Sequence, residues 1–253
     1  MFNILKARIH QKHRTMSYPD GPPPELPPRF VGRPVLREGQ CGSGCRKCLA
    51  ACPVGAVTLD DSGSLRIDTG KCLFCRACST ACPDGIISFS REYRHAAARR
   101  EDLVIHAGSP DYASGVNTLA SKLFRRSLKL RQVSAGGCNA CEADSNVLTT
   151  LAWDMGRFGI EFVASPRHAD GLLVTGCVTE NMRLALRKTY DAVPSPKVVI
   201  AVGACAIAGG PYADHPEQHN GAASVIPVDL FIPGCPPHPL TILEGLLRFI
   251  GRK

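Results

Sequence analysis

The sequence is poor in aromatic residues and has no long hydrophobic run. Aromatic side chains make up 6% of the 253 residues, and there is a single tryptophan. The longest apolar run, residues 198–210, is too short and too rich in glycine to cross a bilayer, so we expect no transmembrane helix. The first residues are polar and basic, without an apolar segment and cleavage site, so we also expect no secretory signal peptide.

A nucleic-acid-binding function is not expected either. The net charge of +8 is compatible with an anionic partner such as nucleic acid or a membrane surface. No known nucleic-acid-binding motif accompanies that charge, however. We therefore interpret the basic residues as a surface that attracts acidic partner proteins, and we expect no nucleic-acid partner.

Cysteine is the residue type that stands out. The chain has 13 cysteines, together with 24 glycines, 20 prolines and enough hydrophobic residues (44%) for the cores of one or two domains. In a chain without a secretory signal the thiols stay reduced, and clustered cysteines then favour metal ligation over disulfides.

The first 40 residues are predicted to form an N-terminal arm. Residues 1–16 can form a short helix with Met1, Leu5 and Ile9 on one face and basic residues elsewhere. Such a helix lies on a membrane surface or against a partner subunit, and the alternative is a frayed basic terminus. Residues 17–40 carry too many prolines for a helix or central strand and are predicted to run extended as a tether.

An internal repeat follows, in which two cysteine runs each end in Cys-Pro and precede a short strand-like segment. The runs span residues 41–53 and 72–83, and the strand-like segments are 55–59 and 85–89. The pattern C-x2-C-x2-C-x3-C-P is typical of bacterial ferredoxins, where three cysteines of a run hold one [4Fe–4S] cluster and the fourth reaches the other cluster. We assign the first cluster to Cys41, Cys45, Cys48 and Cys82, and the second to Cys52, Cys72, Cys75 and Cys78.

The first run departs from that pattern, because three residues rather than two separate Cys41 from Cys45. Gly42 and Gly44 are expected to accommodate the extra residue in a looser loop. Zinc is the alternative metal, but its structural sites use four ligands in two pairs, whereas each run supplies four closely spaced cysteines.

Residues 91–131 are predicted to link the ferredoxin part to a second domain. Residues 90–103 are expected to form a charged helix, 109–117 a loop, and 119–133 a basic, mildly amphipathic segment. In residues 132–253, apolar strands at 158–164, 171–176, 197–203 and 228–234 alternate with helices at 142–156, 179–192 and 239–251. This alternation favours an α/β, flavodoxin-like domain with a mainly parallel sheet, whose ligands lie beyond the carboxyl ends of the strands.

A third metal site is predicted in this second domain. Cys138 and Cys141 follow two glycines, whereas Cys205 and Cys235 each follow a predicted strand. Four thiolates at the carboxyl edge of a parallel sheet can hold a further [4Fe–4S] cluster. The alternative is that Cys205 and Cys235 are small buried apolar residues at strand ends.

Four segments of the second half resemble a known family. They are SLKLRQVSAGGCNACEAD, RFGIEFVASPRHADGLLVTG, PKVVIAVGACAIAGG and VDLFIPGCPPHP. They are similar to the small subunit of membrane-bound [NiFe] hydrogenases of the formate hydrogenlyase type, and to the homologous cluster-bearing subunit of respiratory complex I. The proline-rich arm and the two cysteine runs resemble the dicluster ferredoxin subunit of the same assemblies. The chain then resembles a fusion of two neighbouring subunits.

The resemblance implies an electron-transfer subunit with three [4Fe–4S] clusters, peripheral on the cytoplasmic face of the inner or plasma membrane. It implies a large [NiFe] or complex I-like catalytic subunit, membrane antiporter-like or quinone-type subunits, and a ferredoxin or formate dehydrogenase-type electron partner. The complex I homologue has an adjacent cysteine pair where this chain has Cys-Asn-Ala-Cys, and the spaced pair is the hydrogenase pattern. We expect no catalytic residue in the chain itself.

Several residues within the segments that resemble the family are candidates for roles other than cluster ligation. Glu142, Arg167 and His168 are candidates for tuning the third cluster or contacting a partner subunit, although Glu142 also suits the first turn of a helix. Cys177 stands where the family usually has proline, and we expect it to be a buried apolar residue. Ala204 stands where the family often has an acid.

Two alternative functions remain open from sequence. One is a complex I-like module that reduces quinone or another acceptor without nickel. The other is a non-catalytic iron–sulfur or zinc-binding module.

Overall fold

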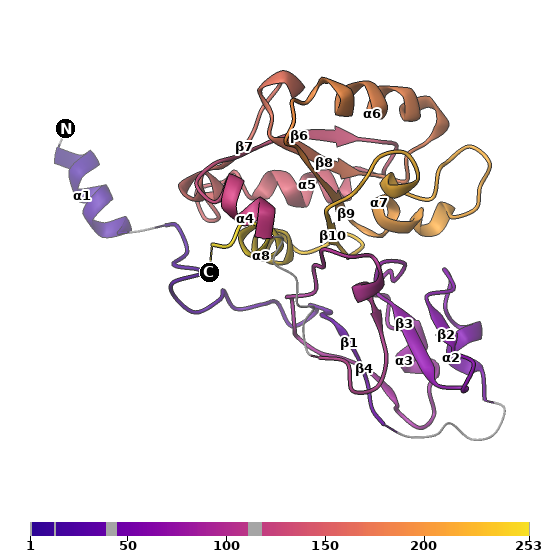
Figure 1. The fold of residues 1–253 in the computed structure, drawn as a ribbon. Helices are drawn as coiled ribbons and strands as arrows, with labels where there is room; N and C mark the ends of the chain where they lie inside the picture. The colour runs from indigo at the N-terminus through magenta and orange to yellow at the C-terminus, as the bar shows by residue number, and fades with distance from the viewer. Residues whose placement is uncertain (1, 13, 39–44, 111–117, 253) are drawn as a thin grey trace.

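The structure is a computed structural model that describes residues 2–12, 14–38, 45–110 and 118–252. Cys41, predicted to ligate the first cluster, lies outside the described residues. The N-terminal half lies against one side of a larger α/β unit, and helix α1 (Phe2–Gln11) projects away from both (Figure 1).

Helix α1 forms as predicted, and none of its residues is buried. Phe2, Ile4 and Ile9 are each at least 74% exposed. The arm that follows is extended, but it ends in strand β1 (Pro34–Leu36), which pairs antiparallel with β4 (Ile87–Phe89). Residues 34–36 are therefore extended, as predicted, and form an edge strand rather than a central one. Pro34 is tolerated because it is the first residue of an edge strand.

The dicluster half is built from short elements. Strands β2 (Val57–Leu59), β3 (Leu65–Asp68) and β5 (Val104–Ile105) form an antiparallel sheet, and helices α2 (Lys47–Ala50) and α3 (Ala77–Ala81) pack against each other. Its core is small and includes the cysteines themselves, since Cys48 and Cys78 are buried among Leu36, Val57, Ile67, Ile87 and Ile105. So small an apolar core is typical of domains that metals or cross-links stabilise.

The charged helix predicted for residues 90–103 is wrong. That stretch is irregular except for the 3-10 helix η1 (Glu101–Leu103). Ala96 and Ala97 are both 1% exposed, and Ala97 exchanges backbone hydrogen bonds with Phe231 at 2.9 and 2.8 Å. Tertiary pairing to the second half has overridden the helix propensity of the alanines.

The second half contains a five-stranded parallel sheet. Its strands are β6 (Leu128–Ser134), β7 (Ile160–Phe162), β8 (Gly171–Thr175), β9 (Val198–Val202) and β10 (Leu230–Ile232), in the order β10-β9-β8-β6-β7. The four predicted strands and the parallel α/β class are confirmed. Strand β6 was not predicted, and it follows a helix α4 (Thr118–Phe124) within the segment expected to be a basic, amphipathic linker.

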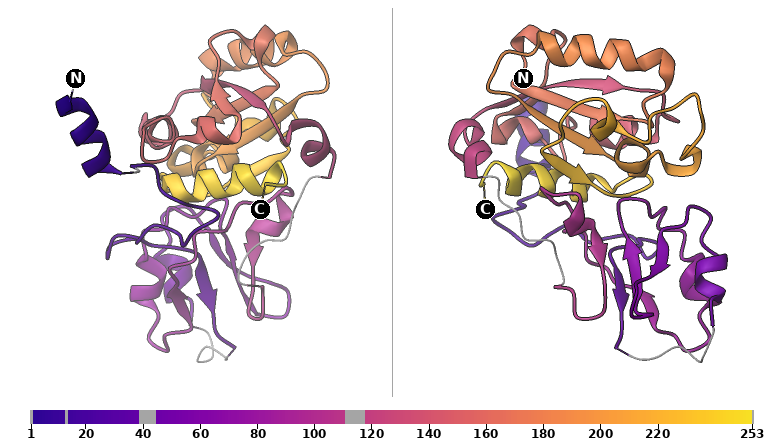
Figure 2. Two further views of the ribbon diagram at one scale, coloured as in Figure 1. Left: turned by 90° about the vertical axis from the view of Figure 1, so that its left-hand side faces the viewer. Right: turned by 45° about the vertical axis from the view of Figure 1, so that its right-hand side comes forward.

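Helices cover both faces of this sheet (Figure 2). Helices α5 (Ala140–Val147) and α8 (Pro239–Phe249) pack on one face, and α6 (Glu180–Ala192) and α7 (Ala204–Ala208) pack on the other. Helix α5 ends at 147 rather than at the predicted 156. Thr149 and Thr150 there donate their hydroxyls to the carbonyls of Asn146 and Val147, a local alternative to helical bonding. The remaining 3-10 helices are η2 (Met155–Phe158), η3 (Pro166–His168), η4 (Gly210–Tyr212) and η5 (Ala222–Ser224).

Helix α8 joins the two halves. All of its residues are buried, because the sheet covers one side and the N-terminal half covers the other (Figure 2). Gly245 is needed at this contact, since a Cβ there would lie 2.9 Å from the Cβ of Ala96. Arg248 donates to the carbonyl of Ala96 at 2.7 Å and pairs with Glu244 at 3.3 Å. Among the described residues, no helix is long and apolar enough to cross a membrane.

Removing Arg248 is expected to weaken this contact between the two halves. The Arg248→Ala variant would remove the guanidinium that pairs with Glu244, whose side chain is 0% exposed. Breaking one side of a buried ion pair costs about 3–5 kcal/mol, measured as the change in free energy of unfolding in denaturant. The double variant Glu244→Leu/Arg248→Met is expected to recover most of that loss. An equal loss in both variants would contradict the assigned role of the pair.

Candidate metal centres

Four cysteines of the second half gather at the carboxyl edge of the parallel sheet. Cys138 lies between β6 and α5, Cys141 in the first turn of α5, Cys205 in α7 after β9, and Cys235 between β10 and α8. The loops carrying Cys205 and Cys235 are tied together, because Gly203 and Ala204 donate backbone hydrogen bonds to Ile232 and Gly234 at 2.9 and 2.8 Å. The structure thus brings the four predicted ligands of the third site together.

The pKa shifts of these thiols agree with their proximity. Burial raises the pKa of the Cys141 thiol, and Cys205, Glu142, Cys235 and Cys138 raise that pKa further. Burial also raises the pKa of Cys205 to about 12, with added contributions from Cys235, Cys177 and Cys138. Like charges act on a pKa only over short distances. Both thiols are therefore neutral in the metal-free protein, and binding of a metal group by these sulfurs would release their protons.

Glycines leave room for the sulfur atoms of this site. A Cβ on Gly203, which has φ +90, would lie 2.5 Å from Cys141 Sγ. A Cβ on Gly210, with φ +59, would lie 2.6 Å from Cys205 Sγ. Loops β6–α5 and β8–α6 also meet through glycines, since a Cβ on Gly176 would lie 2.5 Å from the nitrogen of Gly137. The site fits a group held close to backbone by thiolates.

The alternative of buried apolar cysteines does not hold for Cys205 and Cys235. Cys235 is exposed and Cys205 is half-buried, whereas Cys177 is 3% exposed. Cys177 therefore behaves as the buried residue predicted from sequence. Its thiol lies 3.5 Å from the carbonyl of Gly136, the residue two before Cys138.

Glu142 is held beside the thiols by two hydroxyl groups. It is 6% exposed and accepts hydrogen bonds from Ser134 at 2.5 Å and from Thr175 at 2.6 Å. These two donors stand at the ends of β6 and β8 and were not predicted from sequence. Arg167 and His168 lie elsewhere, in η3 before β8 begins, and so at the opposite edge of the sheet from Cys177.

In the N-terminal half, cysteines from both runs meet as the ferredoxin pattern predicts. Burial raises the pKa of Cys72 to about 12, and Cys78, Cys52 and Cys75 contribute further. Two backbone N–H groups donate to these sulfurs: Ala56 to Cys52 at 3.2 Å and Phe74 to Cys72 at 3.3 Å. Cys45, Cys48 and Cys82 lie around the packed helices α2 and α3.

One interaction crosses from the N-terminal half to the second half. The pKa of Cys235 is raised by burial and then by Cys138 and by Cys75 of the second ferredoxin set. Cys75 and Cys235 are both exposed. Leu73 and Phe74, which precede Cys75, line the same cavity as Cys235. The second and third candidate sites are therefore neighbours in space, although their ligands come from opposite halves of the sequence.

No three His, Cys, Asp or Glu side chains of the described residues are grouped closely enough to hold a single metal ion. A cubane cluster gives each of its four irons one thiolate, so its ligands surround a larger body than one ion.

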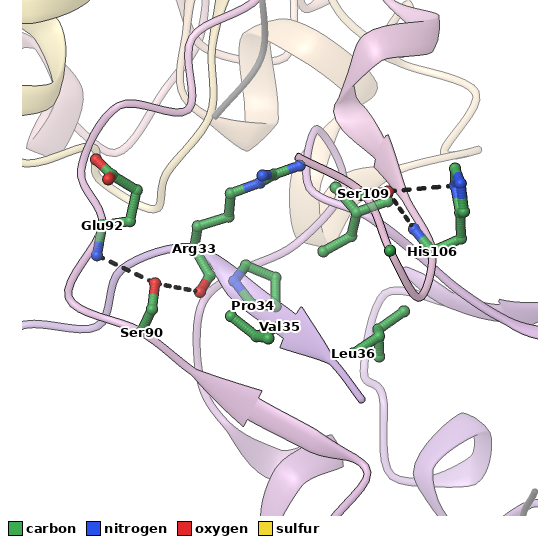
Figure 3. A pocket seen from close by; sticks show the side chains of 10 residues that line it. Arg33, Pro34, Val35, Leu36, Ser90, Glu92, His106 and Ser109 are labelled. Atoms are coloured by element: carbon green, nitrogen blue, oxygen red, sulfur yellow. Dashed lines mark hydrogen bonds between the residues drawn. The ribbon is translucent and has the colours of Figure 1, made fainter. Parts of the chain in front are cut away.

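A hollow of about 290 Å³ lies apart from the cysteines, beside β1 (Figure 3). Ser90 donates to the carbonyl of Arg33 at 2.9 Å and accepts from the backbone of Glu92 at 3.1 Å, and Ser109 contacts His106. Arg33 itself donates to the carbonyl of Pro110. The polar groups of this hollow thus have hydrogen-bond partners within the N-terminal half.

The fold and these sites define an iron–sulfur protein with a dicluster domain and a parallel α/β domain. Residues 40–86 match the 4Fe–4S dicluster domain, and residues 138–249 match the family of the 20 kDa subunit of NADH ubiquinone oxidoreductase.

Three relatives illustrate that family. A probable membrane-bound hydrogenase subunit, mbhJ, of Pyrococcus furiosus is 42% identical over 50% of this chain and 75% of its own. Formate hydrogenlyase subunit 7 of Escherichia coli is 42% identical over 51% of each chain. An NADH-quinone oxidoreductase subunit of Clostridium beijerinckii is 45% identical over 44% of this chain and 66% of its own. The chain belongs to the family of the 20 kDa subunit of NADH ubiquinone oxidoreductase, which it joins to an N-terminal dicluster domain.

Proposed function

We propose that the chain is the electron-transfer subunit of a membrane-bound [NiFe] hydrogenase-like complex of the formate hydrogenlyase type. Three [4Fe–4S] clusters would supply the one-electron chemistry when bound. The residues of the chain would ligate the clusters, bury them and set the distances between them. The observation that supports the proposal is a shared cavity: Leu73 and Phe74, next to Cys75 of the dicluster domain, line the same cavity as Cys235 of the α/β domain. This favours one continuous electron path from the dicluster domain to the α/β domain.

The ligand sets of this proposal are those predicted from sequence. Cys41, Cys45, Cys48 and Cys82 hold the first cluster, Cys52, Cys72, Cys75 and Cys78 the second, and Cys138, Cys141, Cys205 and Cys235 the third. The grouped thiols, the glycines around Cys141 and Cys205, and the backbone donors to Cys52 and Cys72 support these sets. The start of the eight-residue helix α5 at Cys138–Cys141 adds a positive dipole end toward an anionic cluster.

The proposed domain division is an arm at 1–40, a ferredoxin domain at 41–90, a linker at 91–131 and the α/β domain at 132–253. We also assign the α/β domain to the flavodoxin-like topology. Numbered from β6 onward, the strand order is 2-1-3-4-5, which supports this assignment.

The proposed partners are those that the family resemblance implies. They are a large [NiFe] or complex I-like catalytic subunit, membrane antiporter-like or quinone-type subunits, and a ferredoxin or formate dehydrogenase-type electron partner. The similarity to subunits of hydrogenase and NADH-quinone oxidoreductase complexes supports partners of this kind. The chain would lie peripherally on the cytoplasmic face of the membrane. Arg167 and His168, placed away from the thiols, are candidates for contact with a partner subunit.

A complex I-like module without nickel is the second candidate, supported by the similarity to the NADH-quinone oxidoreductase subunit of Clostridium beijerinckii. The spacing of Cys138 and Cys141 by two residues favours the hydrogenase type. Nickel and iron analysis of the native complex tests this choice. We expect nickel in about equal amount to the chain, and its absence with all clusters present would support the second candidate.

Glu142 is expected to lower the reduction potential of the third cluster. Its carboxyl group acts on Cys141 and Cys205, so Glu142→Gln removes a negative charge from beside the thiols. Reduction adds an electron and becomes easier, and the potential measured by electron paramagnetic resonance (EPR) during a redox titration should rise. Glu161→Gln, on an exposed residue of β7, is the matched control and should leave that potential unchanged. A fall or no change in Glu142→Gln would contradict this role.

A further inference from the structure

A cavity of about 320 Å³ lies where the second and third candidate sites meet. Leu73 and Phe74, between two cysteines of the second set, line it from the N-terminal half. Cys235 of the third set lines it from the other half, and His95 of the linking segment also contributes to its wall. A residue in this wall is therefore well placed to act on electron transfer between the two sites.

His95 is a buried aromatic side chain in that wall. Its ring stacks on the ring of Phe74, with centroids 5.4 Å apart and an angle of 30° between the planes. It is 4% exposed, and its Nδ1 has no hydrogen-bond partner among the described residues. Burial, with a contribution from Arg33, lowers the pKa of His95 to about 4, so the ring is neutral near pH 7. The contact with Phe74 is thus one between two neutral rings.

Phe74 has an unusual backbone conformation that serves the neighbouring sulfur. Its φ is +55, in the left-handed region that side chains other than glycine seldom adopt. In this conformation its N–H donates to Cys72 Sγ at 3.3 Å. The stacked ring of His95 packs against the side chain of this residue.

We propose that His95 is a positioning residue for the second cluster: by holding the ring of Phe74, it keeps the Phe74 N–H on the sulfur of Cys72 and raises the reduction potential of that cluster. This inference rests on the proposed assignment of Cys72 as a cluster ligand. Hydrogen bonds to cluster sulfurs favour the reduced, more negative state and so raise the potential. Loss of the His95 ring should therefore lower the reduction potential of the second cluster.

The test compares His95→Ala with His95→Phe in the cluster-loaded full chain. Each protein is reduced with dithionite, one electron per cluster, and followed by EPR at a series of potentials. In His95→Ala we expect the ratio of reduced to oxidised second cluster, measured at a fixed potential, to fall by about tenfold. This fall corresponds to a decrease of about 59 mV in the potential of a one-electron step. It is the effect expected from the loss of one hydrogen bond. In His95→Phe, which keeps the stacked ring, we expect the wild-type potential.

Two further variants keep the test decisive if His95→Ala does not fold. His95→Leu fills the volume without a planar ring, and Phe74→Leu removes the other partner of the stack. Both should lower the potential of the second cluster as His95→Ala does. His106→Ala, an exposed histidine of the same half, is the control and should leave all potentials unchanged.

An unchanged potential in the variants that lose the ring would overturn the inference, and so would an equal shift in His95→Phe. Failure of the proposed function is distinguishable, because iron and the cluster signals would then be missing from the unmutated chain.

Discussion

The Cys205→Ala variant is expected to lose about four of about twelve iron atoms per chain. Cys205 lies in α7 at the carboxyl edge of the sheet, and its thiol acts electrostatically on Cys141. Without this thiolate one iron of the third cluster has no protein ligand, so the cluster should not persist. Electron transfer from the dicluster domain to the proposed catalytic subunit should then stop. Iron quantification and EPR of the purified protein measure the loss.

Cys177→Ala is the matched control for this experiment. Cys177 follows the neighbouring strand β8 and acts on the pKa of Cys205, but its side chain is 3% exposed and its thiol contacts the Gly136 carbonyl. We expect full iron content and a loss of stability of about 1 kcal/mol, typical of a small buried substitution. If Cys177→Ala lost the cluster and Cys205→Ala kept it, the ligand assignment would be wrong.

The Gly203→Ala variant is expected to abolish the third cluster although it replaces none of the ligands. An added Cβ would lie 2.5 Å from Cys141 Sγ and 3.5 Å from the carbonyl oxygen of Gly234, and the φ of +90 is itself unfavourable for alanine. Either the sulfur of Cys141 or the backbone after β9 has to move. Displacing a ligand by even a fraction of an ångström disturbs a site built from rigid elements. The expected result is a loss of iron similar to that of Cys205→Ala.

Gly63→Ala separates this clash from backbone strain. Gly63 also has a positive φ, +79, but nothing lies within 4 Å of its added Cβ. It should cost about 1–2 kcal/mol in free energy of unfolding and no iron from the third site. Equal iron loss in both variants would show that strain, rather than contact with Cys141, governs the site.

The cysteines could be predicted from sequence because their spacing carries the chemistry. The repeated runs indicate which thiols of each half meet, and the structure places Cys52 beside Cys72, Cys75 and Cys78. The parallel sheet could be predicted because buried strands such as residues 198–202 are continuously apolar.

Short elements and long-range contacts could not be predicted in this way. Helix α7 is five residues long, too short for any periodicity, although it carries Cys205. Strand β6 alternates buried and partly exposed residues, but it directly follows basic residues that continue the pattern of helix α4. The hydrogen bond from Thr175 to Glu142 and the stack of His95 on Phe74 join residues far apart in sequence, which no local pattern encodes.

The neighbouring positions of the second and third clusters are the centre of the proposed electron path. EPR of the fully reduced protein tests directly whether these two clusters are close, because paramagnetic clusters that lie close together broaden and split each other's signals. The account predicts three reducible [4Fe–4S] clusters, with magnetic interaction between the second and third that disappears in Cys205→Ala. Three clusters without such interaction, or a chain that holds zinc in place of iron, would contradict it.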